Sequence, residues 1–419
     1  MRQELREQRQ ATAPKHHHWG RWGVLGVLVV LGIIGGVQWV QVSNQKKEAT
    51  TPTTASQTNQ LIDQNAKTSA QQRNQQTTSF DRTVGTANPT FTAKLTSELK
   101  AKKFSGTALV VKNNQVVYQQ SFGWANVAKK QKNAPTTQYL INSLQKSMTG
   151  MLVMQAIEQG KLKLTDKLSQ YYPKIKNSKT VTIRQMLNME AGLVGEMKPN
   201  TELGERQVYQ YAQQHVSVDT SKVGQFDYQP ICYVMLAAIL NQVNHKSYYN
   251  QFYQKIVTPL NLNSTSFVQL RNQTSALSMG YKSTTPSVYT DPQTPAAKDV
   301  SSRLGTGNAT MSPGNVFQTV RAIVQGSRYK TATNADTLLE KGSTTAKYTG
   351  GMYHLDQLGY YGHGVGNFYE DTFIVSTDGK TGVVFMSNDF YKHAMWPTWS
   401  TENIAKSTFK SVLAASSLS

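Results

Sequence analysis

Cysteine is almost absent from this sequence, since Cys232 is the only one among 419 residues. An intramolecular disulfide is therefore excluded, and the fold depends on the burial of apolar side chains. Cys232 lies inside the apolar run 231–240, which predicts an ordinary buried core cysteine. At this length the chain has room for one large domain or two.

Charged residues are absent between residues 22 and 45. The apolar part of this stretch, 22–42, would span about 30 Å as a helix, which matches a bilayer core. Basic residues are more numerous before it than just after it, which predicts a cytoplasmic N-terminus, 1–21, and export of the rest. The sequence therefore predicts a single uncleaved transmembrane signal anchor. A cleaved signal peptide is the alternative, but the run is long for one and no small-x-small cleavage site follows.

Large apolar residues are scarce in 43–88, which is rich in Thr, Gln, Asn, Ser and Ala. Such a composition cannot bury enough surface to fold, so we predict a disordered polar linker. Its reach as a flexible coil is about 40 Å. The linker would hold a folded domain, 89–419, away from the membrane and inside a cell wall.

Acidic residues are also few, with 24 Asp and Glu against 44 Lys and Arg, and the net charge is +20. Outside a cell, such an excess attracts anionic polymers. The predicted partners are therefore a teichoic acid or an anionic membrane surface, and nucleic acid is not expected. A generally basic, solvated surface is the alternative. Export without disulfides favours a Gram-positive exterior.

Periodicity predicts an α+β fold from residue 89 onward. Phe91, Leu95 and Leu99 recur at helical spacing, and Thr182 is a candidate N-cap. Strands at both ends of the domain, with helices between them, predict one antiparallel β-sheet flanked by N- and C-terminal helices, with an inserted helical region that helps form a cleft. The predicted elements are a hairpin, 106–111 and 115–121, a helix, 183–189, a helix, 316–325, a second hairpin, 373–376 and 383–387, and a final helix, 401–414.

A serine and a lysine three residues apart, Ser143 and Lys146, begin an apolar helical run, 144–159. At this spacing both side chains share one helix face, so the amine reaches the hydroxyl. The helix N-terminus offers free N–H groups, and an amine in apolar surroundings loses its proton more readily. Other serine–lysine pairs with this spacing do not begin a buried helix; they lie at 43–46, 97–100, 327–330 and 407–410. The context predicts a nucleophile and its base.

Several blocks around this pair resemble the β-lactamase-related serine hydrolases, which include class C β-lactamases, D-alanyl-D-alanine carboxypeptidases, D-amino-acid esterases and teichoic acid D-alanyl esterases. The block YLINSLQK, 139–146, resembles their nucleophile motif. Blocks similar to the rest of the family follow the same order; they are 106–111, 116–118, 162–173, 182–187 and 191–193. The resemblance covers 90–419 and implies a penicillin-binding-protein-like fold. It implies no metal and no cofactor.

The resemblance implies that Ser143 is the nucleophile and Lys146 its base. Tyr228 stands at the tyrosine of the second motif, Tyr-x-Asn, where a phenol beside cationic groups would pass a proton to the leaving group. The sequence departs from this motif at Pro230, which replaces the asparagine. A site that recognises substrate amides would miss the asparagine's hydrogen bond. This departure disfavours β-lactam and peptide substrates.

The third motif has two candidates. The segment 380–382 reads Lys-Thr-Gly, the usual signature, yet it follows Asp378 and Gly379 between two strand-like runs and is typical of a hairpin turn. His363 lies one strand earlier, where the family often has His-x-Gly. We therefore interpret His363 as the third-motif residue, which would orient a substrate carboxylate or act on Tyr228. A strand histidine bonded to the backbone is the alternative.

The strand of His363 also implies an oxyanion hole. One donor would be the backbone N–H of Ser143 and the other would come from this strand, with Gly364 and Gly366 as candidates and the N–H of Gly366 favoured. Val365 replaces the glycine that is usual at its position. This replacement predicts an altered edge of the pocket.

The sequence thus predicts a membrane-anchored extracytoplasmic serine hydrolase that acts through an acyl-enzyme on D-alanyl groups of the cell envelope. The favoured substrate is the D-alanyl ester of teichoic acid, because an ester needs no amide recognition and the polymer is anionic. A D-alanyl-D-alanine carboxypeptidase acting on peptidoglycan stem peptides is the first alternative. A weakly active or inactive homologue that binds the wall is the second.

Overall fold

The computed structural model describes residues 80–82, 88–268, 277–282, 288–341, 348–389 and 400–415. All of them belong to one compact unit, Thr53–Ser419. The predicted cytoplasmic segment, the transmembrane segment 22–42 and most of the linker lie outside these ranges. Within the ranges, no helix combines the length and the apolar composition that a bilayer span requires.

The folded part of the chain begins before the predicted boundary at residue 89. Phe80 is buried and packs edge-to-face on Phe317, with ring centroids 4.8 Å apart. Asp81 accepts hydrogen bonds from the Ser312 hydroxyl at 2.6 Å and the Gly314 N–H at 2.9 Å, where helix α10 begins. The linker prediction is therefore wrong for 80–82. The aromatic ring of Phe80 and the carboxylate of Asp81, which lies at a helix N-terminus, fix this segment. The polar composition of 43–88 as a whole gave no sign of these two contacts.

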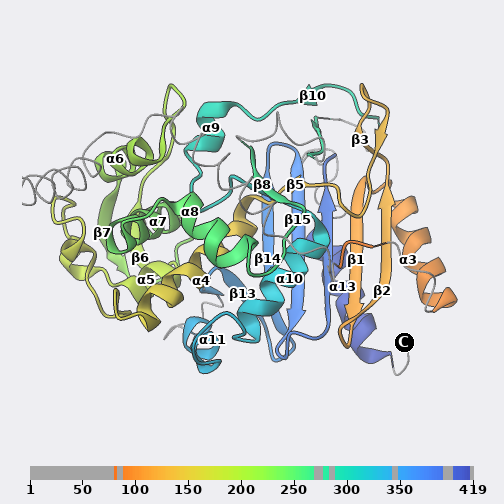
Figure 1. The fold of residues 1–419 in the computed structure, drawn as a ribbon. Coiled ribbons are helices and arrows are strands. Elements are labelled where there is room, and N and C mark those ends of the chain that lie inside the picture. The colour runs from red at the N-terminus through yellow and green to blue at the C-terminus, as the bar shows by residue number, and fades with distance from the viewer. Residues whose placement is uncertain are drawn as a thin grey trace, which may run out of the picture. The chain divides into compact units, whose positions relative to one another are not determined.

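Among the described residues, seven antiparallel strands form the main sheet, in the order β12-β13-β14-β15-β16-β1-β2 (Figure 1). The pairing of β1 with β16 joins both ends of the domain in one sheet, which confirms the α+β prediction. The bounds are β1 (Gly106–Lys112), β2 (Gln115–Phe122), β12 (Tyr348–Thr349), β13 (Met352–Leu355), β14 (Gly359–Gly366), β15 (Tyr369–Ser376) and β16 (Gly382–Ser387).

Shorter strands pair in smaller sheets beside the main one. They are β3 (Trp124–Asn126) with β4 (Gln131–Lys132), β5 (Tyr139–Leu140) with β11 (Ala309–Met311) and β8 (Thr265–Phe267), β6 (Ala191–Val194) with β7 (Ser217–Val223), and β9 (Gly280–Tyr281) with β10 (Pro292–Gln293). The second of these sheets joins the segment before Ser143 to two segments far along the chain.

Helices cover the main sheet and build the region beside it (Figure 1). They are α3 (Pro89–Ala101), α4 (Gln145–Glu158), α5 (Ile183–Leu187), α6 (Glu205–His215), α7 (Ile231–Asn244), α8 (Tyr248–Phe252), α9 (Ala297–Ser301), α10 (Pro313–Val324), α11 (Thr333–Leu338) and α13 (Thr401–Ala414). Short helical turns are η1 (Asn142–Leu144), η2 (Leu168–Gln170), η3 (Ser178–Thr180) and the π-helical η4 (Tyr253–Val257).

The main sheet separates two hydrophobic cores, because alternate side chains of a strand point to opposite faces. On β1, Ala108 and Val110 belong to a core shared with α3 and α13. Leu109 and Val111 belong to the larger core, which α4 and α10 share. The nucleophile helix α4 therefore lies between the sheet and the helical region.

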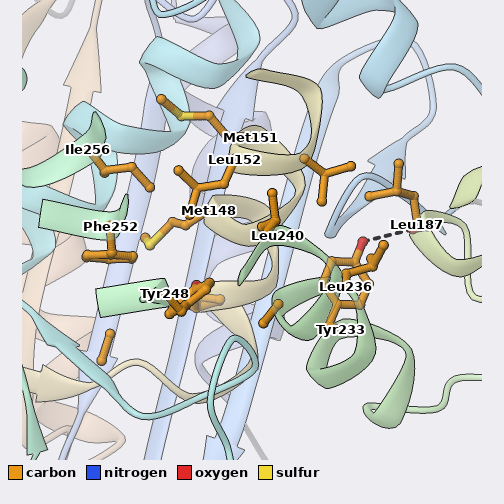
Figure 2. Packing of buried hydrophobic residues seen from close by; sticks show 14 of the residues in the cluster. Met148, Met151, Leu152, Leu187, Tyr233, Leu236, Leu240, Tyr248, Phe252 and Ile256 are labelled. Atoms are coloured by element: carbon orange, nitrogen blue, oxygen red, sulfur yellow. Dashed lines mark hydrogen bonds between the residues drawn. The ribbon is translucent and has the colours of Figure 1, made fainter. Parts of the chain in front are cut away.

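The helical region packs around α4, as Figure 2 shows. Met148 and Leu152 of α4 belong to the same buried cluster as Tyr233 and Leu236 of α7. The Tyr233 hydroxyl donates to the carbonyl of Leu187, at 2.8 Å, which ties α7 to α5. The prediction that Cys232 is a buried core cysteine is confirmed, because this residue of α7 lies in the same core.

Local signals placed most of these elements correctly. Asn88 caps α3 by accepting from the Phe91 N–H at 2.9 Å, and Thr182 caps α5 by accepting from the Gln185 N–H at 3.2 Å. Asn113 turns the first hairpin with a φ of 48°, a conformation that asparagine tolerates. The final helix has the predicted bounds.

A carboxyl group is buried at the start of α6. Glu205 Oε1 accepts from the Tyr248 N–H at 2.6 Å and from the Tyr209 hydroxyl at 2.8 Å. Burial raises the pKa of Glu205 to about 7, although these hydrogen bonds lower it. Between pH 4.5 and 7 the folded state therefore keeps a proton that the unfolded chain has released. Stability that this group contributes at low pH is lost as the pH rises through this range.

We expect the Glu205→Gln variant to lose this pH dependence, because the amide keeps an acceptor oxygen and does not titrate. From pH 5 to pH 7 the free energy of unfolding should fall by about 2 to 3 kcal/mol more in the native chain than in the variant. Urea unfolding at the two pH values measures the difference. Glu196→Gln is the control, since that side chain is 72% exposed. Equal slopes for native chain and Glu205→Gln would contradict the prediction.

Candidate active site

The predicted nucleophile lies on a tight turn at the start of α4. Ser143 is the middle residue of η1, and Asn142 before it has a φ of 46°, in the left-handed region. The Asn142 amide holds this conformation by donating to the carbonyl of Leu140, at 3.0 Å, and of Gly366, at 3.1 Å. Asparagine adopts this backbone region at less cost than most residues. The turn thus projects Ser143 from the helix N-terminus.

Ser143 and Lys146 meet as their spacing predicts. Lys146 Nζ lies 2.8 Å from Ser143 Oγ, and the lysine side chain is buried, with an exposure of 1%. A second, longer contact joins Nζ to the carbonyl of Thr306, at 3.4 Å. The amine is therefore fixed against the hydroxyl, within the range that proton transfer requires.

Gln145, which the sequence reasoning missed, holds α4 in place from its first turn. Its Oε1 accepts from the N–H of Asn308 at 2.7 Å and of Ala309 at 2.9 Å. Its Nε2 donates to Asn308 Oδ1 at 3.0 Å. A fully buried glutamine inside an apolar helix was the available signal, since buried amides need partners. These bonds fix the helix that carries Lys146 to β11.

Tyr228 lies just before α7 and lines the same pocket as Ser143. Lys146 Nζ is 5.2 Å from the centroid of its ring. Tyr228 also stacks on Tyr353, with centroids 6.5 Å apart and planes inclined by 10°. Pro230 occupies the position before the first residue of α7, where the missing N–H of proline has no intrahelical partner to lose. It is exposed and does not line the pocket.

We expect Tyr228→Phe to lower kcat for an ester with an alkyl alcohol leaving group by about 10²- to 10⁴-fold, the usual loss when a proton-transfer group is removed. The ring contacts remain, so stability should change little. A nitrophenyl ester, whose leaving group needs no proton, should lose much less. Stopped-flow or steady-state kinetics with both esters measures the difference. Tyr353→Phe is the matched control, and equal losses for the two esters in Tyr228→Phe would contradict a proton-transfer role.

His363 lies on β14 between two glutamates. Its Nε2 is 2.9 Å from Glu370 Oε1, and its Nδ1 is 3.2 Å from Glu402 Oε2. Glu370 is fully buried, and its second oxygen accepts from the Thr401 N–H at 2.9 Å, at the start of α13. The alternative of a histidine bonded to the backbone is therefore wrong, because both ring nitrogens face carboxylates.

Lys380 lies in a hairpin turn, as the sequence analysis predicted. It is exposed, in the turn between β15 and β16, and its N–H donates to Asp378 Oδ1 at 2.9 Å. The pocket that holds Ser143, Tyr228 and His363 does not include it. The literal Lys-Thr-Gly segment is thus a hairpin turn, and His363 is the third-motif candidate that the fold brings to Ser143.

Gly364 and Gly366 lie against the turn that carries the nucleophile. A Cβ on Gly364 would come within 2.6 Å of the Ile141 carbonyl oxygen and 3.1 Å of the Ser143 nitrogen. A Cβ on Gly366 would come within 2.7 Å of Asn142 Oδ1. Both positions therefore require glycine for close approach. The proposal that this strand and the Ser143 N–H form an oxyanion hole stays a prediction.

The pocket has a volume of about 400 Å³ and is lined by Ser143, Tyr228, Tyr353, Tyr361, His363, Val365 and Glu402. Val365 is 46% exposed at its edge. Tyr353, Tyr361 and Glu402 were not predicted, because they come from β13, β14 and the first turn of α13. Such a pocket, with an activated serine on its wall, can carry out acyl transfer.

Comparisons with known proteins find a matching family and similar sequences. The family model described as Beta-lactamase matches residues 91–403. The chain is 26% identical to "Teichoic acid D-alanine hydrolase" of Staphylococcus aureus over 67% of this chain and 72% of the relative. It is 25% identical to PbpX of Bacillus subtilis (strain 168), a relative named for the penicillin-binding proteins. That match covers 70% of this chain and 73% of the relative.

A solved structure shows the same fold. The crystal structure of FmtA from Staphylococcus aureus superposes with a TM-score of 0.68 and 23% identity, covering 83% of this chain and 94% of that one. The family match covers most of the chain, and the solved structure shares its fold. The chain therefore belongs to the β-lactamase family of serine hydrolases, which also includes proteins related to penicillin-binding proteins.

Proposed function

We propose that the protein is a membrane-anchored extracytoplasmic serine hydrolase that releases D-alanine from D-alanyl esters of teichoic acid. The observation that carries this choice of substrate is the environment of His363. Both of its ring nitrogens are engaged by carboxylates, Glu370 and Glu402. The pocket wall therefore presents a carboxylate of Glu402, and none of the described residues that line the pocket offers an unpaired cation.

This arrangement separates the two candidate substrates by charge. The stem peptide that a D,D-carboxypeptidase cleaves ends in a free carboxylate, which needs a cationic partner when it is desolvated. A D-alanyl ester has no free carboxylate and carries an ammonium group instead. The absence of an asparagine at Pro230 removes one amide contact as well. The pocket thus favours the ester.

Two further observations support the proposal. A relative from Staphylococcus aureus carries the name teichoic acid D-alanine hydrolase. The net charge of +20 favours association with a polymer that carries phosphate groups. A cytoplasmic N-terminus, an anchor over 22–42 and an exported catalytic domain in a Gram-positive wall complete the proposed setting.

The contact between Lys146 and Ser143, and the position of Tyr228 in the same pocket, support the following chemical steps. Lys146 Nζ takes the proton of Ser143 while Oγ attacks the ester carbonyl carbon. The tetrahedral intermediate collapses, its bond to the polymer oxygen breaks, and Tyr228 delivers a proton to that oxygen. Water then attacks the D-alanyl-serine ester and gives a proton to the Tyr228 oxygen, and Lys146 returns its proton to Ser143 Oγ as the acyl bond breaks. Free D-alanine leaves and the Ser143 hydroxyl is restored.

The test compares D-alanylated lipoteichoic acid with a stem pentapeptide as substrates of the full chain, beside Ser143→Ala. Released D-alanine is measured for each. Release from the polymer alone, lost in the variant, is expected. Release from the pentapeptide alone would replace the proposal by a D,D-carboxypeptidase. No release from either, together with no covalent labelling of Ser143 by a fluorophosphonate, would favour a homologue that only binds the wall.

A further inference from the structure

We propose that Glu402 and the tyrosine rings beside it form the subsite for the α-ammonium group of the acyl donor. Glu402 is thereby the residue that makes the enzyme specific for aminoacyl rather than neutral acyl esters. The inference rests on the proposed function and deepens it, because it names the group that distinguishes a D-alanyl ester from other esters.

Glu402 forms part of the pocket wall. It lines the pocket together with Ser143, although it comes from the first turn of the last helix, α13. Its side chain is 21% exposed, so one part of the carboxylate faces the pocket. A carboxylate on the wall of a small pocket attracts an ammonium group more strongly than one in open solvent.

The Glu402 carboxylate can accept more hydrogen bonds than its protein partners supply. Oε2 lies 3.2 Å from His363 Nδ1, and Oε1 contacts the ammonium of Lys406. An ionised carboxylate has about four acceptor positions on its two oxygens. Two of them are in use, and Lys406 does not line the pocket. No other described residue donates to these oxygens, so the remaining positions can accept a substrate ammonium from the pocket side.

Three tyrosine rings form an aromatic wall of the pocket beside Glu402. Tyr228, Tyr353 and Tyr361 all line the pocket and form a column of stacked rings. Tyr353 and Tyr361 have centroids 5.0 Å apart and planes inclined by 22°. Aromatic faces attract cations, and more strongly where water is excluded. These rings carry no positive charge, so the column gives Glu402 an uncharged wall beside it and offers no partner for a carboxylate.

The chain already binds one ammonium group with these same elements. Lys406 Nζ contacts Glu402 Oε1 and lies 4.0 Å from the ring centroid of Tyr361. A carboxylate and a tyrosine face thus hold a primary ammonium from α13 itself. The proposed subsite uses the same pair of groups from the side that faces Ser143.

The experiment compares D-alanyl and D-lactyl esters of one alcohol, which differ only in an ammonium or a hydroxyl on the α-carbon. We expect native protein to prefer the D-alanyl ester in kcat/KM by about 10- to 100-fold, the range of one hydrogen-bonded charge. In Glu402→Gln the preference should collapse toward one, mainly through a higher KM for the D-alanyl ester. Fluorophosphonate labelling of Ser143 confirms that the variant is folded and activated.

Two further variants separate recognition from support of His363. Glu370→Gln removes the other carboxylate on the imidazole and should lower turnover of both esters without changing their ratio. Lys406→Met releases Glu402 from its internal partner and should keep or increase the D-alanyl preference. Equal losses for the two esters in Glu402→Gln would overturn the inference. Hydrolysis of small D-alanyl esters without release from the polymer would overturn the proposed function and leave the subsite intact.

Discussion

Replacing Ser143 by alanine lowers kcat/KM for ester hydrolysis by at least about a thousandfold, the order of loss that follows removal of a covalent nucleophile. The reason is that Ser143 is the hydroxyl that Lys146 contacts, at 2.8 Å, on the wall of the pocket. The variant also forms no adduct with a fluorophosphonate. Intact-mass measurement of the labelled protein, beside substrate kinetics, reports both effects.

Ser147 provides the matched control. It lies one turn further along α4, is fully buried, and donates only a local bond to the Leu144 carbonyl, at 2.8 Å. Ser147→Ala should keep the adduct and the activity. An adduct of undiminished mass shift in Ser143→Ala would place the nucleophile elsewhere and refute the site described above.

Replacing Lys146 by methionine should lower kcat/KM by a similar factor, of at least about a thousandfold. Methionine fills a comparable volume in the apolar surroundings of α4, so the fold should persist while the base is lost. Circular dichroism and the urea midpoint check the fold, and kinetics check the loss. The rate of fluorophosphonate labelling should fall in parallel, because the serine is no longer activated.

Lys146→Arg tests whether the lysine acts as a base or only as a positive charge. Arginine keeps the charge but does not give up its proton in proteins. We therefore expect Lys146→Arg to be as inactive as Lys146→Met. Retention of most of the activity in the arginine variant would exclude the base role and leave an electrostatic one.

The predictions from sequence succeeded where the signal is local. The spacing of Ser143 and Lys146 fixes their contact within one helical turn, and the predicted cap at Thr182 acts within three residues. Lys380 also lies in a hairpin turn as expected, since a turn between two apolar strands is a local pattern. The third-motif role of His363 stays a prediction.

The remainder of the site depends on tertiary pairing that no local pattern encodes. Glu370 reaches His363 because β14 and β15 pair with Val365 opposite Glu370. Glu402 reaches the same ring only because α13 packs against β15. Tyr353 enters the pocket through the pairing of β13 with β14. Asp81 was hidden for the same reason, because its partners lie at the start of α10.

The position of Glu402 on the last helix has a consequence for how the enzyme is made. Glu370 is fixed by the Thr401 N–H, and Glu402 completes the pocket wall, so both depend on α13. Strand β1 likewise cannot pair with the rest of the main sheet until β16 has been synthesised. A chain in the course of synthesis therefore has its serine and lysine long before it has a finished pocket. We expect the enzyme to become competent only after α13 has been synthesised and has packed against β15.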